Sequence, residues 1–246
     1  MRITRMENEE KKIYDKCRKL LTRSSGKRKT GLHVSDLLSP RQAYFKTVLG
    51  ERMSDKQMLY FITGRGHHSI LEALQDGFKE HTVEKYGVTG TLDTFNGIPI
   101  EIKTTRSRST DDYKVTGNYA GQLILYCVMT DTKEGLLVVL FLNYPEDIPI
   151  PDQNSHYNKP GSVPKIKCLD VSFTETELAA ADAFMVRRSA LIEKAIADKD
   201  FSQLPRCESW KCRDCGFLPE CGEPPQFEDY IPPWVTVKEN EQKRLV

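Results

Sequence analysis

Hydrophobic and polar positions follow the helical periodicity in several parts of the chain. They predict a charged helix near the N-terminus, a long central helix, a buried helix and a last helix, over residues 7–23, 54–75, 119–130 and 174–197. Thr174 and Glu177 form a capping box that opens the last of these helices. Ser35 and Ser39, the latter followed by proline, are typical of two further helix starts, because a serine oxygen caps free N–H groups.

Strand-like runs lie between the predicted helices. Alternating or continuous apolar positions predict strands over residues 81–86, 88–95, 98–105, 135–143 and 165–172. The polar residues 106–116 and the Pro-rich residues 144–164 predict loops. Because strands and helices are mixed along the chain, we expect an α/β or α+β fold with a central mixed sheet flanked by helices.

The composition narrows the class of protein. The 246 residues include 36 Lys+Arg and 35 Asp+Glu, and no apolar run approaches the roughly 18 residues of a membrane span. The N-terminus lacks the apolar segment of a secretory signal, so we expect a cytoplasmic protein that does not enter a membrane. The length predicts one large domain with appendages. We expect a basic N-terminal segment, the domain itself, a cysteine segment and a Pro-rich tail, over residues 1–30, 31–204, 205–223 and 224–246.

Positive charge is concentrated at the N-terminus. Residues 1–30 hold 11 Lys+Arg against 4 Asp+Glu, whereas the remaining residues carry net negative charge. Such a segment could track a phosphate backbone. On charge alone, a solvated helix followed by a loop explains the same pattern.

The most informative stretch is the acidic hairpin GTLDTFNGIPIEIK, with its turn at the Asn-Gly pair. In a strand, residues two apart share a face, so Glu101 and Lys103 point one way and Ile102 the other. A strict two-residue turn would place Asp93 on the apolar face. A three-residue loop with Gly97 in a left-handed conformation places Asp93 opposite Glu101 instead. Because the hydrophobic pattern sets the register, we predict this odd-length or bulged turn.

Two carboxylates that face each other repel unless a cation lies between them. Oxygen ligands with open water positions suit Mg²⁺ or Mn²⁺, and such an ion acidifies a bound water and stabilises charge on a phosphoryl oxygen. Lys103, beside Glu101, would orient the attacking water or neutralise the transition state. Taken alone, however, the spacing of Asp93, Glu101 and Lys103 is also common in exposed hairpins with solvated side chains.

The order of four short motifs favours the metal site. Four motifs follow one another along the chain: G-x3-H from Gly64, then G-x-x-D, E-x-K and Q-x3-Y. Together they resemble the RecB-like branch of the PD-(D/E)XK nuclease superfamily, over residues 32–126. The resemblance implies a restriction-endonuclease-like core. It implies a metal held by His68, Asp93, Glu101 and the carbonyl of Ile102, and a catalytic set of His68, Asp93, Glu101, Lys103, Gln122 and Tyr126. His67 leaves the choice of histidine open, although the motif spacing favours His68.

Four of the seven cysteines lie close together, at Cys207, Cys212, Cys215 and Cys221. In a reducing compartment such thiolates are more typical of Zn²⁺ or an iron–sulfur cluster than of disulfides. The segment resembles the C-terminal half of the iron–sulfur staple in CRISPR-associated RecB-like exonucleases and in the AddB helicase–nuclease subunit. In those proteins a distant cysteine before a Pro-Arg pair is the fourth ligand, and this chain has Ser39 there. We expect a structural cluster, 4Fe–4S on the resemblance, with Cys207 as fourth ligand; Cys17, or zinc in place of iron, is the alternative.

The resemblance also implies an activity. It implies a DNA exonuclease that hydrolyses phosphodiester bonds from the ends of single strands, with a 5′→3′ sense favoured. Arg106, Arg108 and Lys114 are candidate phosphate contacts. Partners from CRISPR adaptation or recombination, and an oligomeric state, are compatible with the same resemblance. The alternatives are a non-catalytic DNA-binding or assembly subunit of this fold, and a zinc-bearing recombination nuclease.

Overall fold

The structure is a computed structural model that describes residues 15, 31–73, 80–106, 112–145, 162–207, 209–212 and 214–222. Inside its helices and strands, the side chains of residues 55, 67–73, 112–118, 144–145, 162–163 and 209–210 are outside that description. The Pro-rich tail, Cys17 and Arg108 also lie outside the described residues, as does the predicted N-terminal helix apart from residue 15.

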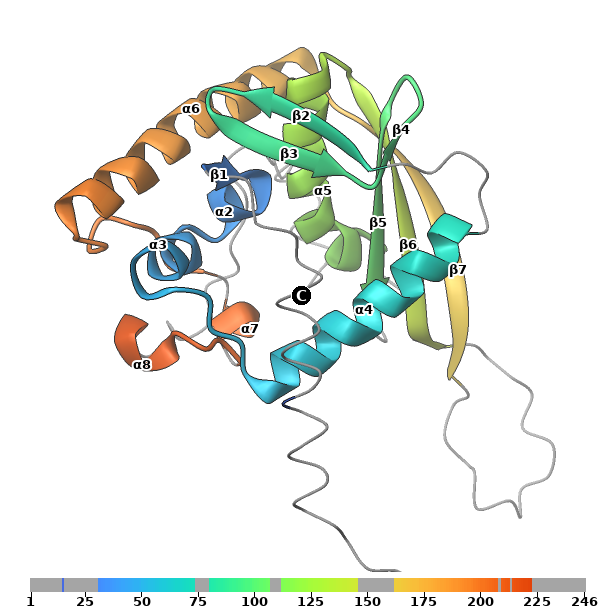
Figure 1. Ribbon diagram of the computed structural model, residues 1–246. Coiled ribbons are helices and arrows are strands. Elements are labelled where there is room, and N and C mark those ends of the chain that lie inside the picture. Colours follow the sequence, from blue (N-terminus) through green and yellow to red (C-terminus); the bar gives the residue numbers. More distant parts are fainter. Residues whose placement is uncertain are drawn as a thin grey trace, which may run out of the picture.

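The strands of the described residues form two sheets (Figure 1). The larger sheet has the order β4-β5-β6-β7, with bounds Thr94–Phe95, Pro99–Thr105, Glu134–Pro145 and Ser162–Ser172. It is mixed, because β5 and β6 are parallel whereas the β4–β5 and β6–β7 pairs are antiparallel. The smaller sheet has the order β1-β3-β2, with bounds Leu32–His33, Val88–Leu92 and His81–Lys85.

One helix connects the two parallel strands of the larger sheet and contributes to both apolar clusters of the core. Parallel neighbours need a crossover connection, and α5 (Asp112–Thr130) supplies it between β5 and β6. Residues 123–128 of α5 are buried and belong to two apolar clusters, one shared with β6 and one shared with the helical layer. That layer consists of α2 (Val34–Leu38), α3 (Pro40–Leu49) and α6 (Glu175–Asp198). Figure 1 shows α5 between the larger sheet and this layer.

Three more helices complete the part of the chain that the structure describes. α4 (Asp55–Ala73) begins beside the cysteine segment, where Lys56 Nζ lies 2.9 Å from an Asp214 carboxylate oxygen, and farther along it contacts β5 (Figure 1). The short helices α7 (Ser209–Cys212) and α8 (Leu218–Cys221) carry the clustered cysteines. Among the described helices, none has the length and apolar character that crossing a bilayer would require.

The predicted fold class, a mixed sheet flanked by helices, is confirmed. The capping box of α6 is also confirmed: Thr174 Oγ1 accepts the Glu177 N–H at 3.2 Å, and the Glu177 carboxylate accepts the Thr174 N–H at 2.8 Å. The predicted helix start at Ser35 is wrong. α2 begins at Val34, and the Asp36 carboxylate accepts the His33 N–H at 2.8 Å in place of a serine cap.

Two predicted loops are shorter than expected. α5 begins at Asp112, so the second half of the predicted loop 106–116 is helical. Its first turns are polar, and the apolar periodicity that reveals a helix starts only at Tyr119. Likewise β6 and β7 continue past a bulge to the pair Pro145–Ser162, inside the predicted loop 144–164. Ladder pairing between neighbouring strands lengthened both of them beyond their apolar runs.

Candidate active site

The acidic hairpin has the predicted three-residue loop. Thr94 pairs with Ile100 and Phe95 with Pro99, which leaves residues 96–98 in the turn, with Gly97 at a φ of 77°. Continuing this register places Asp93 across from Glu101, between the end of β3 and the start of β4. The Asp93 carboxylate accepts the Ile102 N–H at 2.6 Å, which fixes it beside β5.

Glu101 is buried and Lys103 lies beside it. The Glu101 residue is only 2% exposed, and its Oε1 forms an ion pair with the Lys103 ammonium. Among the described residues, the other oxygen, Oε2, is buried without a hydrogen-bond partner. An unsatisfied buried carboxylate oxygen costs free energy, so this side chain is not a solvated surface group. The solvated-hairpin alternative is therefore wrong for Glu101.

Hydrogen bonds from α5 hold Lys103 in place. Gln122 Oε1 accepts from Lys103 Nζ at 2.9 Å, and Gln122 Nε2 donates to the Tyr126 hydroxyl at 2.7 Å. The Tyr126 hydroxyl in turn donates to the Thr91 carbonyl on β3 at 2.8 Å. Gln122 and Tyr126 are one helical turn apart and therefore lie on the same face of α5. The Q-x3-Y and E-x-K motifs are thus joined in one chain of hydrogen bonds.

The glycine of the G-x-x-D motif allows α5 to approach β3. A Cβ added to Gly90 would lie 2.9 Å from Met129 Sδ, 3.0 Å from a Val83 methyl carbon and 3.1 Å from the Tyr126 ring. Such distances are shorter than normal carbon contacts, so a larger residue would push α5 outward. Gly90, three residues before Asp93, therefore lets Tyr126 lie against β3.

Burial and neighbouring charges shift the pKa values of three residues at this site. Burial raises the pKa of Glu101 to about 7; Lys103 opposes this shift, whereas the Asp93 carboxylate adds to it. Burial lowers the pKa of Lys103, but the Glu101 and Asp93 carboxylates outweigh burial and leave that pKa above its usual value. Burial and the charge of Glu101 hold the pKa of Tyr126 well above its ordinary range, so the hydroxyl keeps its proton.

Two of the predicted metal ligands lie together in the described part of the chain. Asp93 and Glu101 lie on facing strands, Glu101 Oε2 has no hydrogen-bond partner there, and burial raises the pKa of Glu101; carboxylates in this arrangement fit a bound cation. His68 belongs to α4, and its side chain lies outside the described residues. No three described Cys, His, Asp or Glu side chains converge on one point, so the third ligand stays a prediction.

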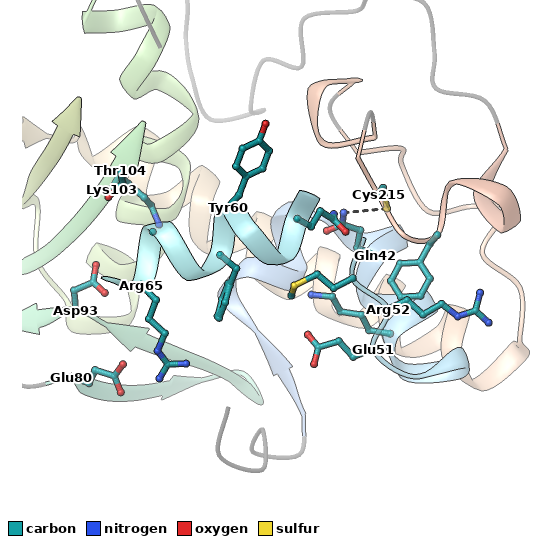
Figure 2. A pocket seen from close by; sticks show the side chains of 16 residues that line it. Gln42, Glu51, Arg52, Tyr60, Arg65, Glu80, Asp93, Lys103, Thr104 and Cys215 are labelled. Atoms are coloured by element: carbon teal, nitrogen blue, oxygen red, sulfur yellow. Dashed lines mark hydrogen bonds between the residues drawn. The ribbon is translucent and has the colours of Figure 1, made fainter. Parts of the chain in front are cut away.

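A cleft of about 740 Å³ opens onto Asp93 and Lys103. Figure 2 shows these two side chains at one end of the cleft, with α4 along its length and Cys215 at the far end. Of the predicted phosphate contacts, Arg106 is exposed just after β5, whereas the side chain of Lys114 lies outside the described residues, as does all of Arg108. Sequence reasoning missed three α4 residues that line the cleft, Tyr60, Phe61 and Arg65; their only signal was the mixture of aromatic and basic residues within a predicted helix.

The cysteine segment is attached to α3 and to the start of α4. Its Phe217 ring stacks on Phe45, with centroids 5.7 Å apart, and Ser54 Oγ donates to the Asp214 carbonyl at 3.0 Å. A Cβ on Gly216 would lie 3.0 Å from the Arg52 carbonyl oxygen. This close approach requires the smallest residue and seats the segment against the loop before α4.

The four cysteines lie near one another, and N–H donors from the start of α3 face their sulfurs. The thiols of Cys207, Cys215 and Cys221 all affect the pKa of Cys212, which burial raises to about 11. Burial also raises the pKa of Cys207, against the opposing effect of the Gln42 backbone N–H. Three contacts point donors at sulfur: Gln42 N–H to Cys207, Gln42 Nε2 to Cys215 at 3.4 Å, and Arg41 to Cys221 at 3.7 Å.

This donor arrangement fits metal-bound thiolates. N–H groups directed at sulfur favour the thiolate, whereas burial disfavours a free thiolate unless a cation replaces the proton. Among the described residues, no three of these thiols converge on one point. Ser39 lies beside the segment, where its Oγ is 3.4 Å from Lys211 Nζ.

Comparison with known proteins identifies the fold. No protein-family model matches the chain, and neither does any curated protein. The crystal structure of SSO0001 superposes with a TM-score of 0.52 at 21% identity, covering 89% of this chain and 98% of that one. The similarity to SSO0001 shows a shared fold.

Two exonuclease structures resemble the chain less closely. A phage-related exonuclease from Haemophilus somnus 129PT gives a TM-score of 0.43 at 14% identity, covering 68% of this chain and 83% of its own. The alkaline exonuclease LHK-Exo from Laribacter hongkongensis gives 0.39 at 15% identity, covering 69% and 93%.

Proposed function

We propose that the protein is a metal-dependent deoxyribonuclease of the RecB-like PD-(D/E)XK type. One observation carries the proposal: a buried Glu101 faces Asp93, with an unpaired carboxylate oxygen, beside a lysine that α5 holds in position. A structural role would not require a buried carboxylate beside two charged side chains, Asp93 and Lys103, that line a cleft. Perturbed titratable groups in a cleft are typical of catalytic sites.

The chain's own residues divide the work of hydrolysis. Asp93, Glu101 and, as a prediction, His68 and the carbonyl of Ile102 would hold Mg²⁺ or Mn²⁺. The ion would supply an acidified water and stabilise phosphoryl charge. Lys103 keeps its proton, because its pKa is raised, so it orients the attacking water or stabilises negative charge rather than acting as a base. Gln122 and Tyr126 are positioning residues, since they reach the site only through Lys103.

The proposed substrate is single-stranded DNA, degraded from an end with a 5′→3′ sense. The open cleft beside Asp93 and Lys103 supports access by a strand, and the exposed Arg106 at the end of β5 supports a phosphate contact. Partners from CRISPR adaptation or recombination belong to the same proposal.

The cysteines are proposed to hold a structural 4Fe–4S cluster through Cys207, Cys212, Cys215 and Cys221. The N–H donors directed at three of the sulfurs support the proposal. Freshly purified protein should then be brown, with the broad visible absorption of an iron–sulfur chromophore. Colourless protein that contains zinc would favour the zinc alternative.

The activity is tested with end-labelled single and double strands in Mg²⁺ or Mn²⁺. Asp93→Asn and Lys103→Met should each abolish metal-dependent cleavage. The matched controls are Asp182→Asn and Lys85→Met, which break another carboxylate–lysine pair, 2.8 Å apart and away from the cleft. Full cleavage by the Asp93 and Lys103 variants would show that the site is misassigned. DNA binding without cleavage by the unaltered protein would favour a non-catalytic subunit.

A further inference from the structure

α4 presents aromatic side chains to the cleft that neither the core nor the proposed metal site uses. Tyr60 and Phe61 each remain 43% exposed, although both line the cleft. Leaving two adjacent large rings in water forgoes the hydrophobic stabilisation of burial. Single exposed apolar residues are common, but neighbouring rings in the wall of a cleft are typical of a binding surface.

Cations lie close to both rings. The Arg106 guanidinium is 5.0 Å from the centre of the Tyr60 ring, and the Lys56 ammonium is 5.8 Å from it. The Arg65 guanidinium is 6.0 Å from the centre of Phe61. Arg106 comes directly after β5, the strand that carries Glu101 and Lys103, so the Tyr60 ring lies close to the end of that strand.

Rings with neighbouring cations suit one kind of polymer. Surfaces that bind single-stranded nucleic acids stack bases on aromatic side chains and pair the phosphates with lysine and arginine. A duplex keeps its bases stacked inside, so it cannot use such rings. Two adjacent rings on α4, with Lys56 before them and Arg65 after them, therefore favour an unpaired strand over a duplex.

The shape of the cleft supports the same occupant. Its volume of about 740 Å³ lies in the range of sites for small molecules, about 300–1,000 Å³, and suits a few unpaired nucleotides. Figure 2 shows Tyr60 between Cys215 at one end and Asp93 with Lys103 at the other, and Arg65 directed toward Glu80. Basic side chains line the cleft alongside the acidic Glu51, Glu80 and Asp93: Lys46, Arg52, Arg65 and Lys103.

We infer that α4 is a base-stacking surface that guides a single DNA strand along the cleft toward Asp93 and Lys103. Tyr60 and Phe61 stack on successive bases, and Arg65 and Arg106 contact the phosphates. The inference rests on the proposed nuclease function for the identity of the polymer. It adds residues that select single strands over duplexes, at a position that the sequence motifs do not include.

The inference is tested by measuring the affinity for a fluorescein-labelled oligothymidine of about 15 nucleotides. Binding is followed by fluorescence anisotropy, with Ca²⁺ in place of Mg²⁺. Tyr60→Ala and Phe61→Ala should each weaken binding by about 5- to 100-fold. Tyr60→Phe should bind with the affinity of the unaltered protein, because the ring remains. The matched control is Tyr86→Ala, which removes a ring that is 49% exposed and has a lysine 5.2 Å from its centre, but lies outside the cleft.

Salt dependence separates stacking from charge. Arg65→Ala should reduce the slope of log affinity against log salt by about 0.7, whereas Tyr60→Ala should leave the slope unchanged. Affinities of Tyr60→Ala and Phe61→Ala equal to that of Tyr86→Ala would overturn the inference, even if Lys103→Met still abolished cleavage. Tight, Tyr60-dependent binding by a protein that cleaves no DNA would instead refute the nuclease proposal and leave the stacking surface in place.

Discussion

The hydrogen bonds of Tyr126 provide a quantitative test of how the site is held together. Tyr126 is 2% exposed, and its hydroxyl accepts from Gln122 at 2.7 Å and donates to the Thr91 carbonyl at 2.8 Å. Tyr126→Phe removes both bonds and leaves the Gln122 amide without this acceptor. A buried hydrogen bond contributes about 1 kcal/mol net, and a buried unpaired group costs about 1–3 kcal/mol. We therefore expect the free energy of unfolding to fall by about 2 kcal/mol.

The same substitution should slow cleavage. Without its anchor, Gln122 gains rotamer freedom and holds Lys103 less firmly, so we expect a single-turnover rate about tenfold lower, equivalent to about 1.4 kcal/mol. Gln122→Leu should lower the rate at least as much, and the double variant no further, because both residues act through Lys103.

Urea unfolding followed by circular dichroism gives the stability, and single-turnover cleavage of a labelled strand gives the rate. The control is Tyr86→Phe, which removes an exposed hydroxyl bonded to Asp182 at 3.2 Å and should change stability by less than about 0.5 kcal/mol. The reasoning is wrong if Tyr126→Phe behaves like this control, or if the Gln122 and Tyr126 effects on the rate simply add.

Two further predictions concern pH and packing. Burial raises the pKa of Glu101 from an ordinary 4.5 to about 7, so between these values the folded state binds more protons than the unfolded state. In urea unfolding, protein stripped of divalent ions should therefore lose stability as the pH rises from about 5 to 7, and Glu101→Gln should remove this loss. The same dependence of stability on pH in Glu101→Gln would contradict the assigned burial. Gly216→Ala would place a Cβ 3.0 Å from the Arg52 carbonyl oxygen and should destabilise the protein by about 1–3 kcal/mol in thermal unfolding; Gly66→Ala, with nothing within 4 Å, is the control and should be neutral or stabilising.

The sequence alone predicted the register of the acidic hairpin. Glu101 and Lys103 alternate with apolar residues, and only a three-residue loop gives Asp93 the same face, so the pattern left one solution. The sequence predicted the boundaries of α5, β6 and β7 less accurately. Helical and strand hydrogen bonds continued there into polar or Pro-containing segments, where no apolar periodicity marks their ends.

What the sequence determined by itself is therefore local: alternation along β5, the capping box of α6 and the grouping of four cysteines. Each follows from residues close together in the chain, whose spacing fixes their relative positions. Only the tertiary structure decided that Glu101 is buried, that Gln122 bonds to Lys103, and that α4 lines a cleft between the acidic pair and the cysteines. Burial and cross-chain contacts depend on how separate elements pack, and the periodicity of one element carries no information about its neighbours.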